Sequence, residues 1–92
     1  MPGIEVRRLA ADSARRMVTM MVRMAPGTSY PPHRHAADEE CLVMSGELLV
    51  GTERLRAGDY QKAAKGSVHP VQSTDTGCAL FITSSQDDEL VG

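Results

Sequence analysis

The sequence predicts an all-β fold, and three observations lead to that prediction. Apolar and polar residues alternate with a period of two in residues 4–7 and 17–24, which is the period of a strand with one buried face. Gly and Pro divide the chain at short intervals, for example at the Pro-Gly pair 26–27, as expected for turns between short strands. Extended helical periodicity is lacking. A small sandwich or barrel is therefore the expected architecture.

The individual elements follow from the same pattern, in chain order. Residues 9–16 are the one stretch that could be helical, although they hold too few apolar residues to anchor a helix by packing. Residues 45–46 (Ser-Gly) predict a bend or hairpin turn within an apolar run, and residues 84–92 are predicted to be a polar tail. Strands are expected at 4–7, 17–24, 41–50, 53–56 and 78–83.

Composition limits the class of protein. The chain has 92 residues, enough for one domain. Its formal net charge is −2, and it has no basic cluster of the kind that nucleic-acid binding needs. No apolar stretch approaches the roughly 20 residues that span a bilayer, and the N-terminus lacks the apolar core of a signal peptide. Two cysteines, Cys41 and Cys78, fit a reducing compartment. The expectation is a cytoplasmic single domain, without nucleic-acid or membrane partners.

The histidines are the most informative residues. Only three are present, His33, His35 and His69, and Glu39 follows the first pair. In an extended segment His33 and His35 project from the same face. Three imidazoles and one carboxylate suit a divalent metal such as Fe, Mn, Co, Ni or Zn, and leave about two positions open on a six-coordinate ion. Protons compete with metal for the imidazoles, so affinity should fall at low pH.

Each of these residues also has a plainer interpretation. A His-x-His pair on a strand is usually incidental, and His69, which precedes Pro70, could be a turn residue. Glu39 and Glu40 could be solvated loop charges. The spacing of all four residues together is what favours a metal site.

That spacing resembles the first motif of the cupin superfamily. The motif reads G, five residues, H-x-H, three or four residues, E, six residues, G, and residues 27–46 match every fixed position, from Gly27 to Gly46. The glutamate that keeps the six-residue spacing to Gly46 is Glu39. On a strand Glu40 would face the opposite side, so Glu39 is expected to point inward and Glu40 outward.

A second motif follows at residues 58–73. The cupin pattern is G, five residues, P-x-G, two residues, H, three residues, N, and this segment keeps every spacing, with His69 at the histidine. Ala64 replaces the proline and Ser73 replaces the asparagine. Neither position is a metal ligand in the superfamily.

The resemblance implies that residues 1–92 form one RmlC-like cupin jelly-roll barrel. It also implies that His33, His35, Glu39 and His69 bind one divalent transition metal ion inside the barrel. The segment PPHRHAADEECLVMSGEL looks most like the cupin domain of ChrR-type anti-sigma factors and its relatives, which include small dioxygenases of the acetylacetone-cleaving type.

Two further residues are candidates for the surroundings of the metal. Cys41 shares parity with Glu39 and should lie inside the barrel, as a neighbour of the ligands, an extra soft ligand, a redox-sensitive thiol, or, most simply, a packing residue. Tyr60 either lines the cavity or is half-exposed. The sequence does not identify a catalytic residue.

Three functions fit this pattern. The first is a metal-dependent enzyme, for example an Fe(II) dioxygenase acting on a small organic molecule held in the barrel. The alternative is a non-catalytic, ChrR-like sensor or ligand-binding domain with bound zinc. A metal-free cupin that uses a histidine as a base is the third. A homodimer is also expected, because an open jelly roll has edge strands to cover and residues 4–6 alternate suitably for pairing.

Overall fold

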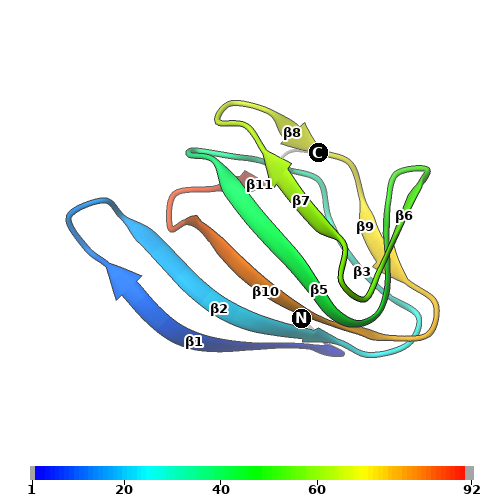
Figure 1. Ribbon diagram of the computed structural model, residues 1–92. Helices are drawn as coiled ribbons and strands as arrows, with labels where there is room; N and C mark the ends of the chain where they lie inside the picture. Colours follow the sequence, from blue (N-terminus) through cyan, green and yellow to red (C-terminus); the bar gives the residue numbers. More distant parts are fainter. Residues whose placement is uncertain (1, 91–92) are drawn as a thin grey trace.

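The computed structural model describes the backbone of residues 2–90 and the side chains of residues 2–88, and within them only strands, turns and bends occur (Figure 1). The prediction of an all-β fold is therefore confirmed. The strands are β1 (Ile4–Asp12), β2 (Met17–Met24), β3 (Thr28–Tyr30), β4 (His33–Arg34), β5 (Glu39–Val50), β6 (Glu53–Arg56), β7 (Tyr60–Ala63), β8 (Val68–His69), β9 (Gln72–Thr74), β10 (Cys78–Ser85) and β11 (Glu89–Leu90).

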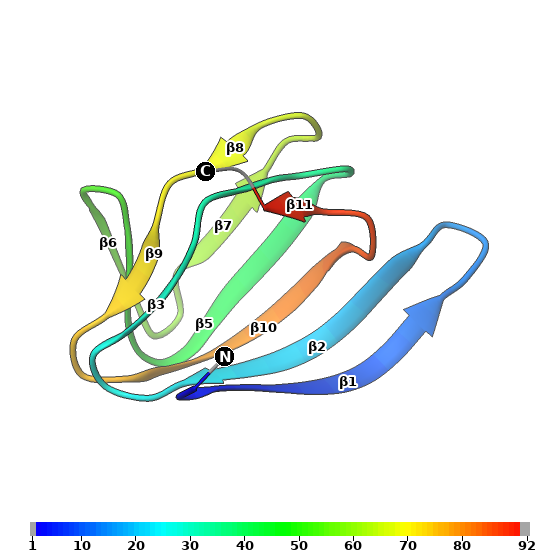
Figure 2. The ribbon, with the colours of Figure 1, turned by 180° about the vertical axis from the view of Figure 1, so that it is seen from behind.

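The strands form a jelly roll, as expected for a cupin, in which a curled main sheet and a smaller second sheet surround the interior. The main sheet runs in the order β1-β2-β10-β5-β9-β3, with β6 and β7 also paired to β5, and a second sheet runs β11-β4-β8. Seen from two opposite sides, the main sheet curls from β1 round to β3, and the second sheet lies across its open side (Figures 1 and 2). This arrangement encloses an interior onto which β4, β5 and β8 all border.

Strand β5 is long because it bends and changes partners. Its first half pairs with β7 and β10, and its second half pairs with β6 and β9. Gly46 lies at the bend with a φ of +74°, and a side chain there would collide with the carbonyl oxygen of Gly77. Only glycine meets both requirements. Of the two outcomes predicted for residues 45–46, the bend is therefore the one that forms.

The structure decides one alternative that the sequence leaves open and corrects one expectation. Residues 9–16 are not helical: β1 continues to Asp12, whose carboxylate accepts a hydrogen bond from the Arg15 N–H (3.1 Å), and the chain turns there. Pairing of β1 with β2 along its whole length supplies the backbone hydrogen bonds that a helix would otherwise make. The predicted polar tail is also structured, because residues 84–85 end β10 and residues 89–90 form β11 against β4. Residues 91–92 lie outside the described part.

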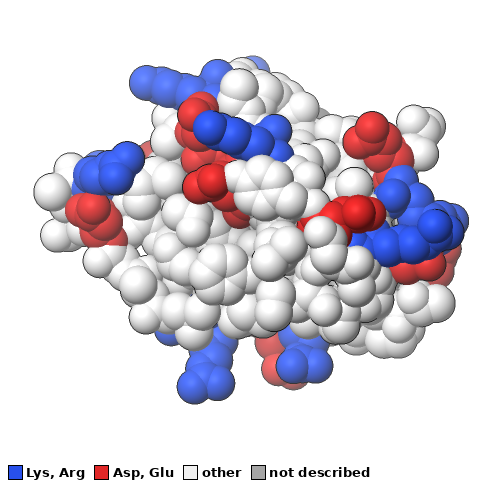
Figure 3. Space-filling model, viewed as in Figure 1, with Lys and Arg blue, Asp and Glu red and all other residues white. Residues whose placement is uncertain are grey.

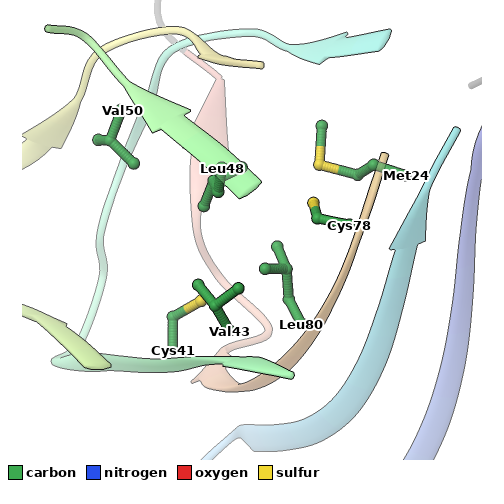
Figure 4. Close-up of a cluster of buried hydrophobic side chains, with 7 residues drawn as sticks. All are labelled: Met24, Cys41, Val43, Leu48, Val50, Cys78 and Leu80. Atoms are coloured by element: carbon green, nitrogen blue, oxygen red, sulfur yellow. The ribbon is translucent and has the colours of Figure 1, made fainter. Parts of the chain in front are cut away.

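The core is apolar and contains no aromatic ring. Alternate residues of β5 and β10 point into the barrel, and they meet Met24 from β2 (Figure 4). The single Phe, Phe81, lies on the outside of β10 and is 38% exposed. The buried cluster consists of Met24, Cys41, Val43, Leu48, Val50, Cys78 and Leu80.

The outer surface carries charges of both signs. On the face shown in Figure 3, acidic and basic side chains lie beside one another around an uncharged centre. Lys62 and Asp38, for example, approach within 3.9 Å. In residues 2–90 the structure contains no helix with the length and apolar character needed to cross a membrane.

Candidate metal centre

The two motifs meet because their strands pair. His33 on β4 and His69 on β8 are direct partners in the second sheet. Just beyond this pair, the His35 N–H donates to the Ser67 carbonyl (2.9 Å), and the Gly66 N–H donates to the His35 carbonyl (2.7 Å). These bonds hold His35 beside the turn that precedes β8. Glu39 enters from the first position of β5.

The four side chains converge on one point. One nitrogen or carboxylate oxygen from each of His33, His35, Glu39 and His69 lies within 4.8 Å of the others. The His35 and His69 ring centres are 4.4 Å apart, and that of His33 lies 4.7 Å from His35 and 5.2 Å from His69. Glu39 oxygens approach Nδ1 of both His35 and His69 to 3.7 Å. All four residues are therefore placed to share one ion.

Burial controls the electrostatics of this cluster. None of the four residues is more than 6% exposed. Burial lowers the pKa of His69 to about 4, with a further contribution from the neighbouring imidazoles, and lowers the pKa of His35 as well. Burial also raises the pKa of Glu39 to about 7, helped by the nearby charge of Asp88. The imidazoles of His35 and His69 are thus kept neutral, which is the form that binds a metal.

The nitrogen atoms of the cluster are arranged better for binding a metal ion than for hydrogen bonding to one another. His35 Nε2 and His69 Nδ1 are 3.0 Å apart, but Nδ1 of His35 and Nε2 of His69 are buried with no hydrogen-bond partner among the described residues. An ion bound between the two rings would take the lone pairs of His35 Nε2 and His69 Nδ1, which face each other, and would leave each ring's N–H on its other nitrogen. Imidazole and carboxylate together suit a first-row divalent ion such as Fe, Mn, Co, Ni or Zn.

The two adjacent glutamates face opposite sides of β5. Glu39 is buried, whereas Glu40 is exposed and accepts a hydrogen bond from the Tyr60 hydroxyl on the outer surface. Tyr60 is 54% exposed. The suggestion that Tyr60 lines the metal cavity is therefore wrong, because β7 presents this residue on the same outward side as Glu40.

Cys41 is inside the barrel but belongs to the apolar core. It is 1% exposed and packs within the cluster that contains Val43 and Leu80. Burial raises the pKa of its thiol to about 12, and the nearby Glu39 adds to this shift. A thiol in such surroundings stays protonated and is a poor metal ligand. Of the roles that the sequence leaves open for Cys41, its position favours packing.

One residue beside the cluster is not expected from the sequence. Asp88, in the turn between β10 and β11, places Oδ2 3.4 Å from His35 Nδ1, while its Oδ1 accepts the Ala36 N–H (3.0 Å). The sequence predicts only a polar tail for residues 84–92, and no motif or periodicity marks Asp88. Its only signal in the sequence is that it is an acid near the end of the last long strand.

A cavity of about 280 Å³ adjoins the cluster. His33, Glu39 and Asp88 form part of one side, together with the amide of Gln72. Tyr30, Ser84, Ser85 and Gln86 also line the cavity. The rest of the lining is apolar and comes from β1, β2 and β10: Ile4, Val6, Val18, Met20, Val22, Met24, Leu80 and Ile82. A small molecule with an apolar body and a polar end fits this lining.

Solved structures with the same fold include an enzyme and an anti-sigma factor. An acetylacetone dioxygenase from Acinetobacter johnsonii superposes with a TM-score of 0.89 at 18% identity, covering 98% of this chain and 64% of that one. The anti-sigma factor ChrR, in complex with SigE of Rhodobacter sphaeroides, superposes with a TM-score of 0.80 at 21% identity, covering 92% and 46%. At such identities the likeness establishes the fold alone.

Sequence comparison is more specific. Germin-like protein 3-1 of Oryza sativa subsp. japonica is 31% identical over 94 residues, which cover 91% of this chain and 42% of that protein. This chain thus spans less than half of that relative. The family described as the ChrR cupin-like domain matches residues 1–87, which include both histidine motifs and nearly every described residue. By this match, and with the barrel and its buried histidine cluster in agreement, the chain belongs to the ChrR cupin-like domain family.

Proposed function

We propose that His33, His35, Glu39 and His69 bind one divalent transition metal ion, and that the protein uses it to act on a small organic molecule. The observation that carries this proposal is the buried set of four convergent donors beside a cavity with an apolar wall. Four protein ligands leave about two positions of a six-coordinate ion for a bound molecule. Reaction of the dioxygenase type is the activity that we favour.

Residues of the cavity wall would bind the substrate and orient it. Met20, Val22 and Leu80 would hold the apolar body of the substrate, and Gln72 would hydrogen-bond its polar end. Ferrous iron, when bound, supplies redox chemistry with dioxygen and Lewis-acid polarisation of a chelating substrate. The apolar lining would limit contact of bulk water with the reacting group.

Metal analysis followed by an oxygen-uptake assay tests this proposal. We expect close to one metal per chain in purified protein, and oxygen consumption by the iron form with a small 1,3-diketone. His69→Ala should lose both, whereas Glu40→Gln, on the outer face, should keep both. Protein that binds no divalent metal after reconstitution would overturn the proposal.

A second candidate is a non-catalytic zinc-bound sensor or ligand-binding domain. The observation in its favour is the match to the ChrR cupin-like family across residues 1–87. Selective retention of zinc over iron, no oxygen uptake, and a melting temperature raised by small apolar acids or ketones would favour it over the enzyme.

We further propose that the protein is located in a reducing compartment such as the cytoplasm. Its two buried cysteines are free thiols, which supports this proposal.

We also propose that the protein is a homodimer formed through β1. This strand pairs only with β2 among the described residues, so one edge of the main sheet is open. Val6 and Leu9 on β1 are 61% and 48% exposed. Light scattering should return twice the mass of one chain, and Val6→Lys should shift the population toward monomer. A monomeric wild-type protein at micromolar concentration would contradict the proposal.

A further inference from the structure

The turn between β10 and β11 is held in place by several separate contacts. The Gln86 N–H donates to the Arg16 carbonyl (2.9 Å), and the Arg16 guanidinium binds both oxygens of Asp87 (2.6 and 2.7 Å). On the far side of the turn, β11 pairs with β4, the strand that carries His33. These contacts fix where the side chain of Asp88 lies, between the β1–β2 turn and the metal-binding strand.

The two oxygens of Asp88 have different neighbours. Oδ1 accepts the Ala36 N–H at 3.0 Å, which anchors the carboxylate to the segment next to His35. Oδ2 lies 3.4 Å from His35 Nδ1, within reach of a hydrogen bond but not yet aligned for one. The side chain is 18% exposed, so water competes only weakly for this oxygen.

The two ring nitrogens of His35 also have different neighbours. Nε2 points toward His69, at 3.0 Å from its Nδ1, and so faces the centre of the cluster. Nδ1 faces two carboxylates, Asp88 at 3.4 Å and Glu39 at 3.7 Å. Glu39 belongs to the set of convergent donors, whereas Asp88 lies outside it. Once Glu39 is committed to the metal, Asp88 is the partner that remains for Nδ1.

We infer that Asp88 is a positioning residue that accepts a hydrogen bond from the Nδ1–H of His35 and thereby leaves Nε2 free to bind the metal. This inference rests on the proposed metal site. A histidine ligand commonly donates its other N–H to a carboxylate, which fixes the tautomer and makes the ligand more basic. A small rotation of the carboxylate or of the ring completes the hydrogen bond.

Asp88→Asn is the sharpest test because it preserves the shape of the side chain. The asparagine carbonyl can still accept the Ala36 N–H, but its NH₂ group then faces His35 Nδ1. An NH₂ donor favours the opposite tautomer, in which Nε2 carries the proton and cannot bind metal. The matched control is Asp87→Asn, one residue away, which weakens the exposed pair with Arg16 and does not touch His35. The Gln86–Arg16 backbone bond and the pairing of β11 with β4 still hold the turn in this variant.

Competition titrations with a chromogenic chelator would measure zinc affinity of the three proteins. We expect Asp88→Asn to weaken zinc binding by about 10- to 100-fold, and Asp87→Asn to change it by less than about twofold. Equal affinity of Asp88→Asn and the wild type would overturn the inference. An equal loss in Asp87→Asn would also overturn it, because the effect would then come from the packing of the turn.

A second measurement separates this inference from the metal proposal. Two-bond ¹H–¹⁵N correlation spectra of the imidazoles report which nitrogen of a neutral histidine carries the proton, with or without metal. In chelator-treated wild type we expect the proton of His35 on Nδ1, and in Asp88→Asn on Nε2. Failure of the wild type to bind metal would overturn the proposed function, whereas an unchanged tautomer in Asp88→Asn would overturn the role of Asp88.

Discussion

Strand β5 contributes to two buried regions of the same barrel, with Glu39 in the metal cluster and Val43 and Leu48 in the apolar core. Both regions are closed to solvent, since Glu39 is 6% exposed and Leu48 is fully buried. They differ in the interactions that their buried atoms require. The core side chains need only close packing with one another, whereas the cluster contains ring nitrogens with no hydrogen-bond partner among the described residues.

This difference indicates that the two regions stabilise the protein in different ways. Burial of apolar surface in the core favours the folded state without dependence on a metal ion or on the protonation of the site. The cluster gathers polar groups at a cost, and that cost is recovered when a ligand binds the folded state only. The core should therefore respond to changes of volume, and the cluster to metal, chelator and pH.

The largest effect is expected from a cavity in the core. Leu48→Ala should lower the free energy of unfolding by about 3 to 4 kcal/mol, the usual range for a fully buried leucine. Urea denaturation with and without chelator measures the loss, which should be the same in both. Met44→Ala, at an exposed position of the same strand, is the control and should change stability little. A loss in Leu48→Ala that appears only in the presence of metal would contradict the separation of the two regions.

Removal of a metal-binding side chain should change metal affinity strongly and the stability of the metal-free protein less than a cavity in the core does. His69→Ala takes away one donor, and we expect its metal affinity to fall by at least about 100-fold, more than for a residue that only supports a ligand. Its melting temperature should no longer depend on chelator, while the melting temperature of the chelated form changes less than in Leu48→Ala. Titration calorimetry and thermal melts check both points. Retention of a chelator-sensitive melt in this variant would show that the stabilising ion is bound elsewhere.

Glu39 should make metal binding dependent on pH near neutrality. Its pKa is raised from 4.5 to about 7, so the carboxylate must lose a proton to bind metal below pH 7. The pKa of His69 is lowered to about 4, so this imidazole is already neutral over the same range. Through Glu39, affinity should fall by about tenfold per pH unit between pH 7 and pH 5, the slope for release of one proton.

Glu39 and His69 should affect the stability of the chelated protein in opposite directions. The folded pKa of His69 is lowered, so its contribution to stability is lost as the pH falls from 6.5 towards 4. Because its folded pKa is raised, Glu39 contributes stability that is fully present below pH 4.5 and is lost as the pH rises through 7. Because metal affinity rises over this range, the difference between metal-loaded and chelated melting temperatures should widen from pH 5 to pH 7.5. In Glu39→Gln the chelated protein should not show this loss. A difference that is as large at pH 5 as at pH 7.5 would argue against Glu39 as a ligand.

The smallest effect is expected one residue further along β5. Glu40→Gln should leave metal affinity within about twofold of the wild type, because this side chain lies on the outside of the barrel with Tyr60. Only the weak surface contact between the two side chains is altered. Loss of metal binding in this variant, with retention in Glu39→Gln, would mean that the register of β5 is shifted by one residue.

Much of the site could be predicted because it is encoded by local spacing. His33 and His35 are two residues apart on an extended segment, and parity along a strand separates Glu39 from Glu40. The same period of two, with Gly and Pro between the runs, is sufficient for the fold class. The bend at Gly46 is also visible in the sequence, because a glycine within an apolar run marks a place where a strand bends or bulges.

The sequence by itself therefore determined the all-β class, the shared face of His33 and His35 and the opposite faces of Glu39 and Glu40, since these depend on short-range alternation that every strand obeys. That His69 joins them was implied by the resemblance of the two motifs to those of the cupin superfamily. Only the tertiary structure decided the position of Asp88, which reaches Ala36 across 52 residues of chain. It also decided that residues 9–12 pair with β2, and that Tyr60 meets Glu40 on the outer surface. Such contacts depend on which strands pair and in which register. The curl of the whole sheet sets that pairing, and no local pattern records it.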